Sequence, residues 1–273
     1  MNPEDVRHYR SINKKLAKYD WFISPYYSRM NLKRVIDFLD RQTAPQNKRD
    51  REVVGRKIAD MLIRLNLEFG FRAVIVYEGY RMTPNVSKFS HLIEAGLFEM
   101  YTANHITCLS VWTPIVEGVF RSMLKMPPTK DFRIEDVMKL KAKQSEYQPF
   151  LTAILKTITR FLQRTLYSSY RNSQLCSSYN LNRHLLVHLS SNEPTYCRNN
   201  CLRLLNVLDS LLAIDFIITD EYRGIFDGNS PRVKHREQYY ELLMRFAFSK
   251  VGEMRFALPE DHPNFSEEFY FGV

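Results

Sequence analysis

The sequence predicts an all-α protein, and three observations support this fold class. Apolar residues recur at helical spacing along most of the 273-residue chain. The one short apolar run with the length of a strand, Ala73–Tyr77, fits a buried connector equally well. No internal repeat, low-complexity tract or obvious linker interrupts the helical pattern. We therefore expect a protein built from packed helices.

Residues 1–85 are predicted to form a separate helical subregion. A polar stretch with a proline, Thr43–Asp50, is typical of a loop. The helix after it is expected to end at Gly70, because glycine favours helix ends. Its apolar face follows the three-and-four spacing of a buried helix side through Val54, Ile58, Met61, Leu62, Leu65 and Phe69.

Residues 87–125 are predicted to contain two further helices. The first carries Phe89, Leu92, Ile93 and Leu97 on one face. The second carries an apolar face from Leu109 to Met123 and ends at Met126-Pro-Pro-Thr. Ser110 or Thr113 is its expected N-cap, with Pro114 in its first turn, where proline is tolerated. The charged segment 130–146 is expected to be a loop with one short helix over 134–143.

The helix over Tyr147–Tyr167 has the clearest periodicity in the chain. Its apolar positions follow the i, i+3, i+4, i+7 rule: Leu151, Ile154, Leu155, Ile158, Phe161, Leu162 and Leu166. Lys156, Arg160 and Arg164 recur every four residues on another face and form a basic ridge. A solvated helix face and an RNA-contacting face are both consistent with this ridge.

After a short motif helix over about 181–189, two more helices are predicted in the C-terminal third. The helix over Tyr196–Ile218 is apolar nearly all round, which is typical of a protein core or a subunit interface. After a loop at Gly224–Pro231, a last helix is expected over Arg236–Phe248, followed by a tail that wraps the surface.

Composition limits the possible environments and partners. Thirty-nine Lys and Arg against 30 Asp and Glu give a net charge of +9, which favours polyanionic partners but also fits a solvated basic surface. No run of about 18 apolar residues is present, and the start lacks the layout of a signal peptide, so we expect a cytoplasmic protein without a membrane span. The cysteines, Cys108, Cys176, Cys197 and Cys201, are expected to be small buried residues without disulfides.

The segment Asn180–Ser190 concentrates polar chemistry between two apolar helices. It places Arg183, His184 and His188 within about one and a half helical turns. Desolvating such groups is costly unless an anion or a hydrogen-bonding partner meets them, which indicates a site. A zinc site that combines these histidines with Cys197 and Cys201 is a weaker alternative, so we predict neither a metal nor a cofactor.

These residue types suit RNA cleavage without a metal. One histidine deprotonates the ribose 2′-hydroxyl, which attacks the adjacent phosphorus, and a second, protonated histidine gives its proton to the departing 5′-oxygen. The guanidinium of Arg183 stabilises the charge that grows on the phosphate oxygens. DNA is excluded because it lacks the 2′-hydroxyl.

The block Asn182-Arg-His-Leu-Leu-Val-His, with the helix that begins near Asn200, resembles the HEPN superfamily of helical nucleic-acid-processing domains. That superfamily carries an arginine, then four to six residues, then a histidine, often with a polar residue after the arginine; Arg183, His184 and His188 match these places. The stretch from Ile93 to Val119 is also similar to its leading helices, so the resemblance spans roughly 87–219. Leu189 departs from the pattern, because many relatives have glycine there.

The resemblance implies an HEPN-like helical bundle over residues 86–219, with the additional subregion 1–85 before it and a helix and tail, 220–273, packed on it. It also implies a homodimer with two motifs facing each other, and a metal-independent endoribonuclease of a prokaryotic toxin–antitoxin or antiviral system, with an antitoxin or regulatory partner. In this assignment Arg183 stabilises the phosphate, His188 is the acid and base, and His184 assists.

Further residues are expected to bind the RNA. Asn182 positions phosphate or caps the motif helix, and Tyr179 stacks on a base or packs at a helix end. Arg160 and Arg164 of the basic ridge contact the backbone. In the alternative interpretation, Arg183 pairs with an acidic residue of the apolar helices, Glu117, Asp209 or Asp215, and the domain is a non-catalytic binding module for RNA or a partner protein.

Overall fold

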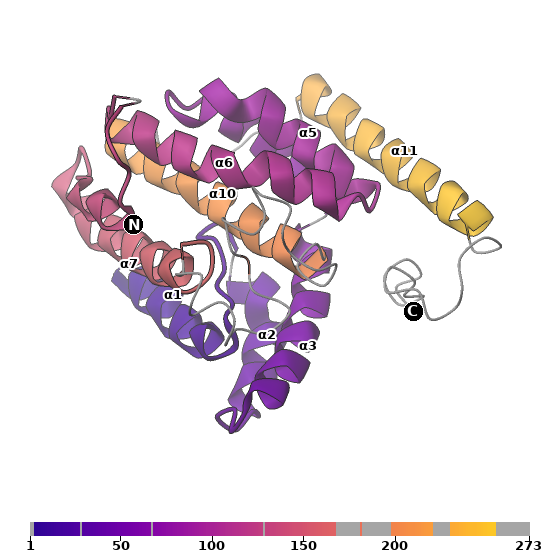
Figure 1. Cartoon of the computed structure of the whole chain (residues 1–273), viewed down its shortest axis with the longest axis horizontal. Coiled ribbons are helices and arrows are strands. Elements are labelled where there is room, and N and C mark those ends of the chain that lie inside the picture. Colours follow the sequence, from indigo (N-terminus) through magenta and orange to yellow (C-terminus); the bar gives the residue numbers. More distant parts are fainter. Residues whose placement is uncertain are drawn as a thin grey trace.

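The computed structural model in Figure 1 describes residues 3–27, 29–66, 68–127, 129–167, 181, 198–220 and 230–254. Within these ranges the regular structure is helical and contains no strand, which confirms the all-α prediction. The α-helices are α1 (Pro3–Leu16), α2 (Arg29–Asp40), α3 (Lys48–Asn66), α4 (Phe69–Val74), α5 (Ser90–Tyr101), α6 (His105–Met123), α7 (Gln148–Arg164), α10 (Arg198–Thr219) and α11 (Pro231–Met254). The shorter elements are the 3₁₀ turns η1 (Ala17–Tyr19), η3 (Val86–Phe89), η4 (Ile134–Lys139) and η5 (Ser145–Tyr147), and the π-helix η2 (Ile75–Tyr80).

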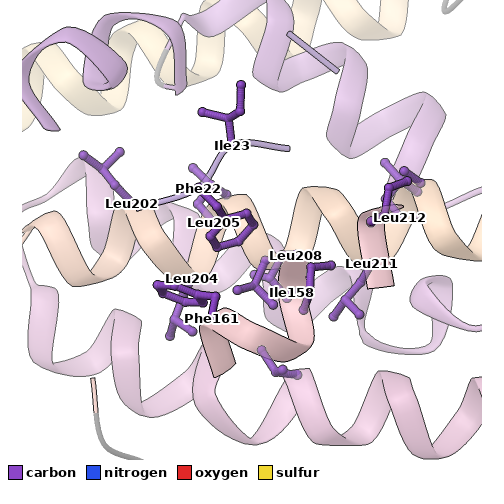
Figure 2. Close-up of a cluster of buried hydrophobic side chains, with 14 of the residues drawn as sticks. Phe22, Ile23, Ile158, Phe161, Leu202, Leu204, Leu205, Leu208, Leu211 and Leu212 are labelled. Atoms are coloured by element: carbon purple, nitrogen blue, oxygen red, sulfur yellow. The ribbon is translucent and has the colours of Figure 1, made fainter. Parts of the chain in front are cut away.

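Helix α10 is the centre of the fold. Every residue from Asn200 to Ile217 is buried, as the apolar pattern of the predicted core helix requires. Figure 1 shows α5 and α6 on one side of α10, with α7 and the N-terminal helices on the other, and α10 contacts α6, α7 and α3. Its leucines pack against Ile158 and Phe161 of α7 and against Phe22 and Ile23 (Figure 2). Each fully buried leucine contributes roughly 1.5–3 kcal/mol to the free energy of folding.

The hydrophobic core is one cluster, and its residues come from all three predicted segments of the chain, 1–85, 86–219 and 220–273. Ile58 comes from residues 1–85, Val116 from 86–219 and Tyr240 from 220–273. Glu94 of α5 connects the last helix to the others, since it accepts hydrogen bonds from Tyr240 and from Arg81 and lies 3.1 Å from Arg236. The boundaries near residues 85 and 219 stay a prediction.

The predicted helix end at Gly70 was wrong. Gly70 does not end a helix: α3 ends at Asn66, and Gly70 lies in the first turn of α4. Glu68 caps α4, because its carboxylate accepts a hydrogen bond from the backbone N–H of Phe71. The stretch 73–77 is not a strand; it forms the end of α4 and the start of the π-helix η2.

The start of α6 was also predicted wrongly. Its N-cap is Asn104, whose side chain accepts from the backbone N–H of Thr107, not Ser110 or Thr113. Pro114 therefore lies in the helix interior rather than in its first turn. Against this helix, α5 approaches so closely at Gly96 that any added Cβ would overlap the ring of Trp112, which donates a hydrogen bond to the carbonyl of Ile93.

Of the other predicted helices, the one over about 181–189 lies outside the described residues. Those over 147–167, 196–218 and 236–248 are present with shifted ends. The helix over 147–167 is α7, and the last helix is longer than expected. The short helix within 130–146 is a 3₁₀ turn, η4. No helix in the described parts of the chain is both long and apolar enough to cross a membrane.

His105 at the start of α6 makes stability depend on pH. Burial and, to a smaller extent, the nearby cation of Arg198 lower the pKa of His105 from 6.5 to about 4. Between about pH 6.5 and 4, His105 is protonated in the unfolded chain but stays neutral in the folded one. The free energy of unfolding therefore falls as the pH falls through this window. The side chain retains partial contact with solvent, and we therefore expect a loss of about 2 kcal/mol rather than the roughly 3 kcal/mol of a full shift.

Urea unfolding of the wild type and of His105→Gln at pH 7 and pH 4.5 measures this loss. The difference between the two proteins isolates His105 from the other six histidines of the chain. We expect the free energy of unfolding to fall less with pH in the variant. Equal falls in both proteins would contradict the assignment.

Candidate nucleic-acid interface

Helix α7 presents the predicted basic ridge on its exposed side. Its apolar residues, including Leu151, Ile158 and Leu162, are buried against the core. Lys156, Arg160 and Arg164 are exposed and follow one another at intervals of four residues, about 6 Å along the helix axis. Neighbouring phosphates of one nucleic-acid strand are separated by a comparable distance.

Helix α1 supplies a second row of cations opposite this ridge. Its amphipathic pattern buries Tyr9, Ile12 and Leu16 and leaves Arg10 and Lys14 exposed, one turn apart. Helix α1 contacts α7 directly, and a guanidinium N–H of Arg10 donates to the carbonyl of Pro149 at 3.1 Å. The two rows therefore lie across a shared groove.

This basic groove between α1 and α7 has a volume of about 580 Å³. Its polar lining includes the five cations Arg10, Lys14, Lys156, Arg160 and Arg164. The acidic residue of the lining, Asp20, pairs with Arg51 at 3.5 Å. Because cations outnumber carboxylates in a concave surface, the groove concentrates positive potential and attracts polyanions.

The floor of the groove is rigid and apolar. Trp21, Phe22 and Phe161 line it, and each is nearly fully buried. The guanidinium of Arg203 lies 4.6 Å from the centre of the Trp21 ring, which adds a cation–π contact behind the floor. Asn13 ties the floor to α1, because its side chain donates to the carbonyl of Tyr9 and accepts from the N–H of Ile23. Buried rings cannot stack on bases, so the groove suits a phosphate backbone.

The structure brings together only part of the predicted site. Arg160 and Arg164 line the groove. Arg183, His184, His188, Asn182 and Tyr179 lie outside the described residues, as does Cys197 of the alternative zinc site. The sequence did not point to Arg10 and Lys14; their i, i+4 spacing on an amphipathic helix was the available signal.

The acidic residues that were alternative partners for Arg183 have other partners. Asp209 accepts hydrogen bonds from both terminal nitrogens of Arg72 and from Tyr80. Asp215 accepts from the backbone N–H groups of Asn85 and Val86 and from the Asn85 side chain. Glu117 pairs with Arg121 at 2.8 Å.

Cys201 has the environment of an ordinary buried thiol. Burial raises its pKa well above the usual range, and the neighbouring thiol of Cys108 raises it further. In the described ranges, no group of three or more His, Cys, Asp and Glu side chains is arranged to hold a metal ion.

Fold and groove together define the class of protein: an all-α protein with a concave basic surface between two helices. Comparisons with protein-family models, with curated proteins and with solved structures find no match.

Proposed function

We propose that the protein binds single-stranded RNA in the basic groove between α1 and α7 and cleaves it as a metal-independent endoribonuclease of HEPN type. The observation that supports this proposal most is the pair of facing cation rows, Arg10 and Lys14 opposite Lys156, Arg160 and Arg164. A strand lying between them meets cations on both sides, and each phosphate that is neutralised releases counterions. The cationic side chains on both walls of the groove are exposed to solvent. Such an arrangement suits a chain of phosphates better than a small ligand.

The chemistry is assigned to the motif that follows α7 in the sequence. His188 acts as acid and base on the 2′-hydroxyl and the leaving 5′-oxygen, and Arg183 stabilises the phosphate. His184 and Asn182 assist by positioning the phosphate. A homodimer supplies the motif twice, and regulation by an antitoxin in a toxin or antiviral system accords with the resemblance.

The first test is cleavage by the wild-type protein in EDTA. Incubation with a single-stranded RNA should give products that end in 2′,3′-cyclic phosphate, because the 2′-oxygen is the nucleophile. Binding without cleavage would favour the rival function, a non-catalytic module that holds RNA. Absence of both binding and cleavage would contradict both.

The second test concerns the groove. The triple variant Lys156→Gln/Arg160→Gln/Arg164→Gln should bind a 2′-O-methyl oligoribonucleotide about 50-fold more weakly at low salt, because three phosphate contacts are lost. The slope of log K against log salt should fall by about 2, since each contact to a single strand contributes about 0.7. Fluorescence anisotropy across a salt series measures both quantities.

A charge-matched control tests the groove against another basic hollow, whose lining includes Lys33, Arg34 and Arg41. Lys33→Gln/Arg34→Gln/Arg41→Gln removes the same number of exposed cations from α2 and the turn after it. We expect this variant to keep the wild-type salt slope within about half a unit. Equal losses in the two triple variants would show that RNA has no preferred groove.

A further inference from the structure

A second, smaller pocket lies beside the groove, on another side of α1. Its volume is about 270 Å³, below the roughly 300–1,000 Å³ of sites for drug-sized ligands. Aromatic side chains dominate its walls: Tyr9, Tyr26, Tyr27 and Phe150. The rings of Tyr9 and Phe150 meet edge to face at 5.7 Å, so the walls are held in place. A flat aromatic ligand of one or two rings fits these dimensions.

Polar side chains that can form hydrogen bonds with a ligand also line this aromatic pocket. Ser24 lines it, is 1% exposed, and its hydroxyl has no hydrogen-bond partner among the described residues. The backbone N–H of Ser24 donates to the side chain of Asn206 in α10, which fixes the position of the serine. An unsatisfied buried hydroxyl is costly, and a ligand that bonds to it removes that cost. The exposed carboxylate of Asp5 and the imidazole of His8, about one turn further along α1, also line the pocket.

The aromatic pocket and the basic groove share their supporting elements. Tyr9 lines the pocket and Arg10, the next residue of α1, lines the groove, about 100° round the helix. Likewise Phe22 lines the groove, and Ile23 and Ser24 line the pocket. A helix with its side chains is about 10–12 Å across, so one flexible RNA strand can occupy the groove and reach the pocket.

We propose that this pocket holds one unpaired nucleobase of the RNA strand that the groove binds, and that the Asp5 carboxylate selects bases with an exocyclic amino group. The proposal rests on RNA binding in the groove. A carboxylate accepts a hydrogen bond from the N4 amino group of cytosine, and it repels the carbonyl oxygen that uracil carries at the same position. Tyr26, the half-buried ring among these aromatic walls, stacks on the base, as in other single-strand sites.

The test compares two 2′-O-methyl oligoribonucleotides of equal length, one of cytidine and one of uridine. We expect the cytidine strand to bind about tenfold more tightly at the same salt concentration. Asp5→Asn should bring the two affinities within about twofold, because the amide no longer discriminates between donor and acceptor. Ser24→Ala should weaken cytidine binding by about threefold without changing the salt slope.

Glu4→Gln is the matched control, because it removes one exposed carboxylate from the same turn of α1 without altering the pocket lining. This control should keep the full preference for cytidine. Equal wild-type affinities for the two strands, or a preference that survives in Asp5→Asn, would overturn the pocket assignment. In either case salt-dependent binding of the uridine strand would still report the groove, so the two proposals fail separately.

Discussion

Replacement of Arg72 with methionine is expected to lower the free energy of unfolding by about 3–5 kcal/mol, because it leaves a buried carboxylate without its cation. Arg72 of α4 and Asp209 of α10 are both fully buried and join through two hydrogen bonds of 2.8 and 2.7 Å. Tyr80 donates a third bond to the same carboxylate. Asp209 has no route to water from this position, so its charge cannot be solvated instead.

Urea unfolding of the purified variant at pH 7 measures this loss. The control is Arg72→Met/Asp209→Asn, which removes both charges and keeps an acceptor for Tyr80. We expect the double variant to recover most of the lost stability, since the penalty comes from the unpaired charge rather than from the lost pair itself. A loss below about 1 kcal/mol in the single variant would contradict this interpretation.

The buried ion pair also supports the proposed base pocket. A guanidinium nitrogen of Arg72 lies 3.5 Å from the hydroxyl of Tyr27, and Tyr27 forms one wall of that pocket. Burial raises the pKa of the Tyr27 hydroxyl well above its usual value. The central helix α10 therefore holds the pocket from two sides, through Asp209 and Arg72 and through Asn206 and Ser24.

The parts of the fold that the sequence predicted are those governed by local periodicity. The apolar stripe of α7 and the continuous apolar surface of α10 each specify a helix and its buried side. Prediction failed where one side chain decides the geometry. Gly70 resembles a helix end, but the Glu68 carboxylate starts a new helix there. Pro114 resembles a first-turn proline, but Asn104 caps the helix well before it.

The groove could be predicted only in part, because its two walls come from opposite ends of the sequence. Periodicity placed Lys156, Arg160 and Arg164 on one face of α7. It contains no information on which helix lies opposite, and the contact from Arg10 to Pro149 spans 139 residues. The basic residues of α1 were therefore recognised as part of the groove only from the packing of α1 on α7.

Loss of catalysis without loss of binding is the outcome expected for the motif variants. His188→Ala should slow RNA cleavage by about 100- to 10,000-fold, the usual contribution of a general acid and base. Arg183→Ala should slow it by about 100- to 1,000-fold, since a charged donor no longer meets the developing phosphate charge. Both variants should bind a 2′-O-methyl strand with the wild-type salt slope, because the groove cations belong to α1 and α7.

Rates come from a single-turnover assay in EDTA with a labelled RNA, and a parallel substrate carries one 2′-deoxyribose at the cleaved position. The matched control is His91→Ala, which removes an exposed histidine of α5 outside the motif and should leave the rate unchanged. The deoxy substrate should resist the wild-type protein at that position, because the attacking oxygen is missing. If His188→Ala cuts as fast as the wild type, the motif is not the catalytic centre. If the upstream fragment ends in a 3′-hydroxyl, the nucleophile is not the ribose 2′-oxygen.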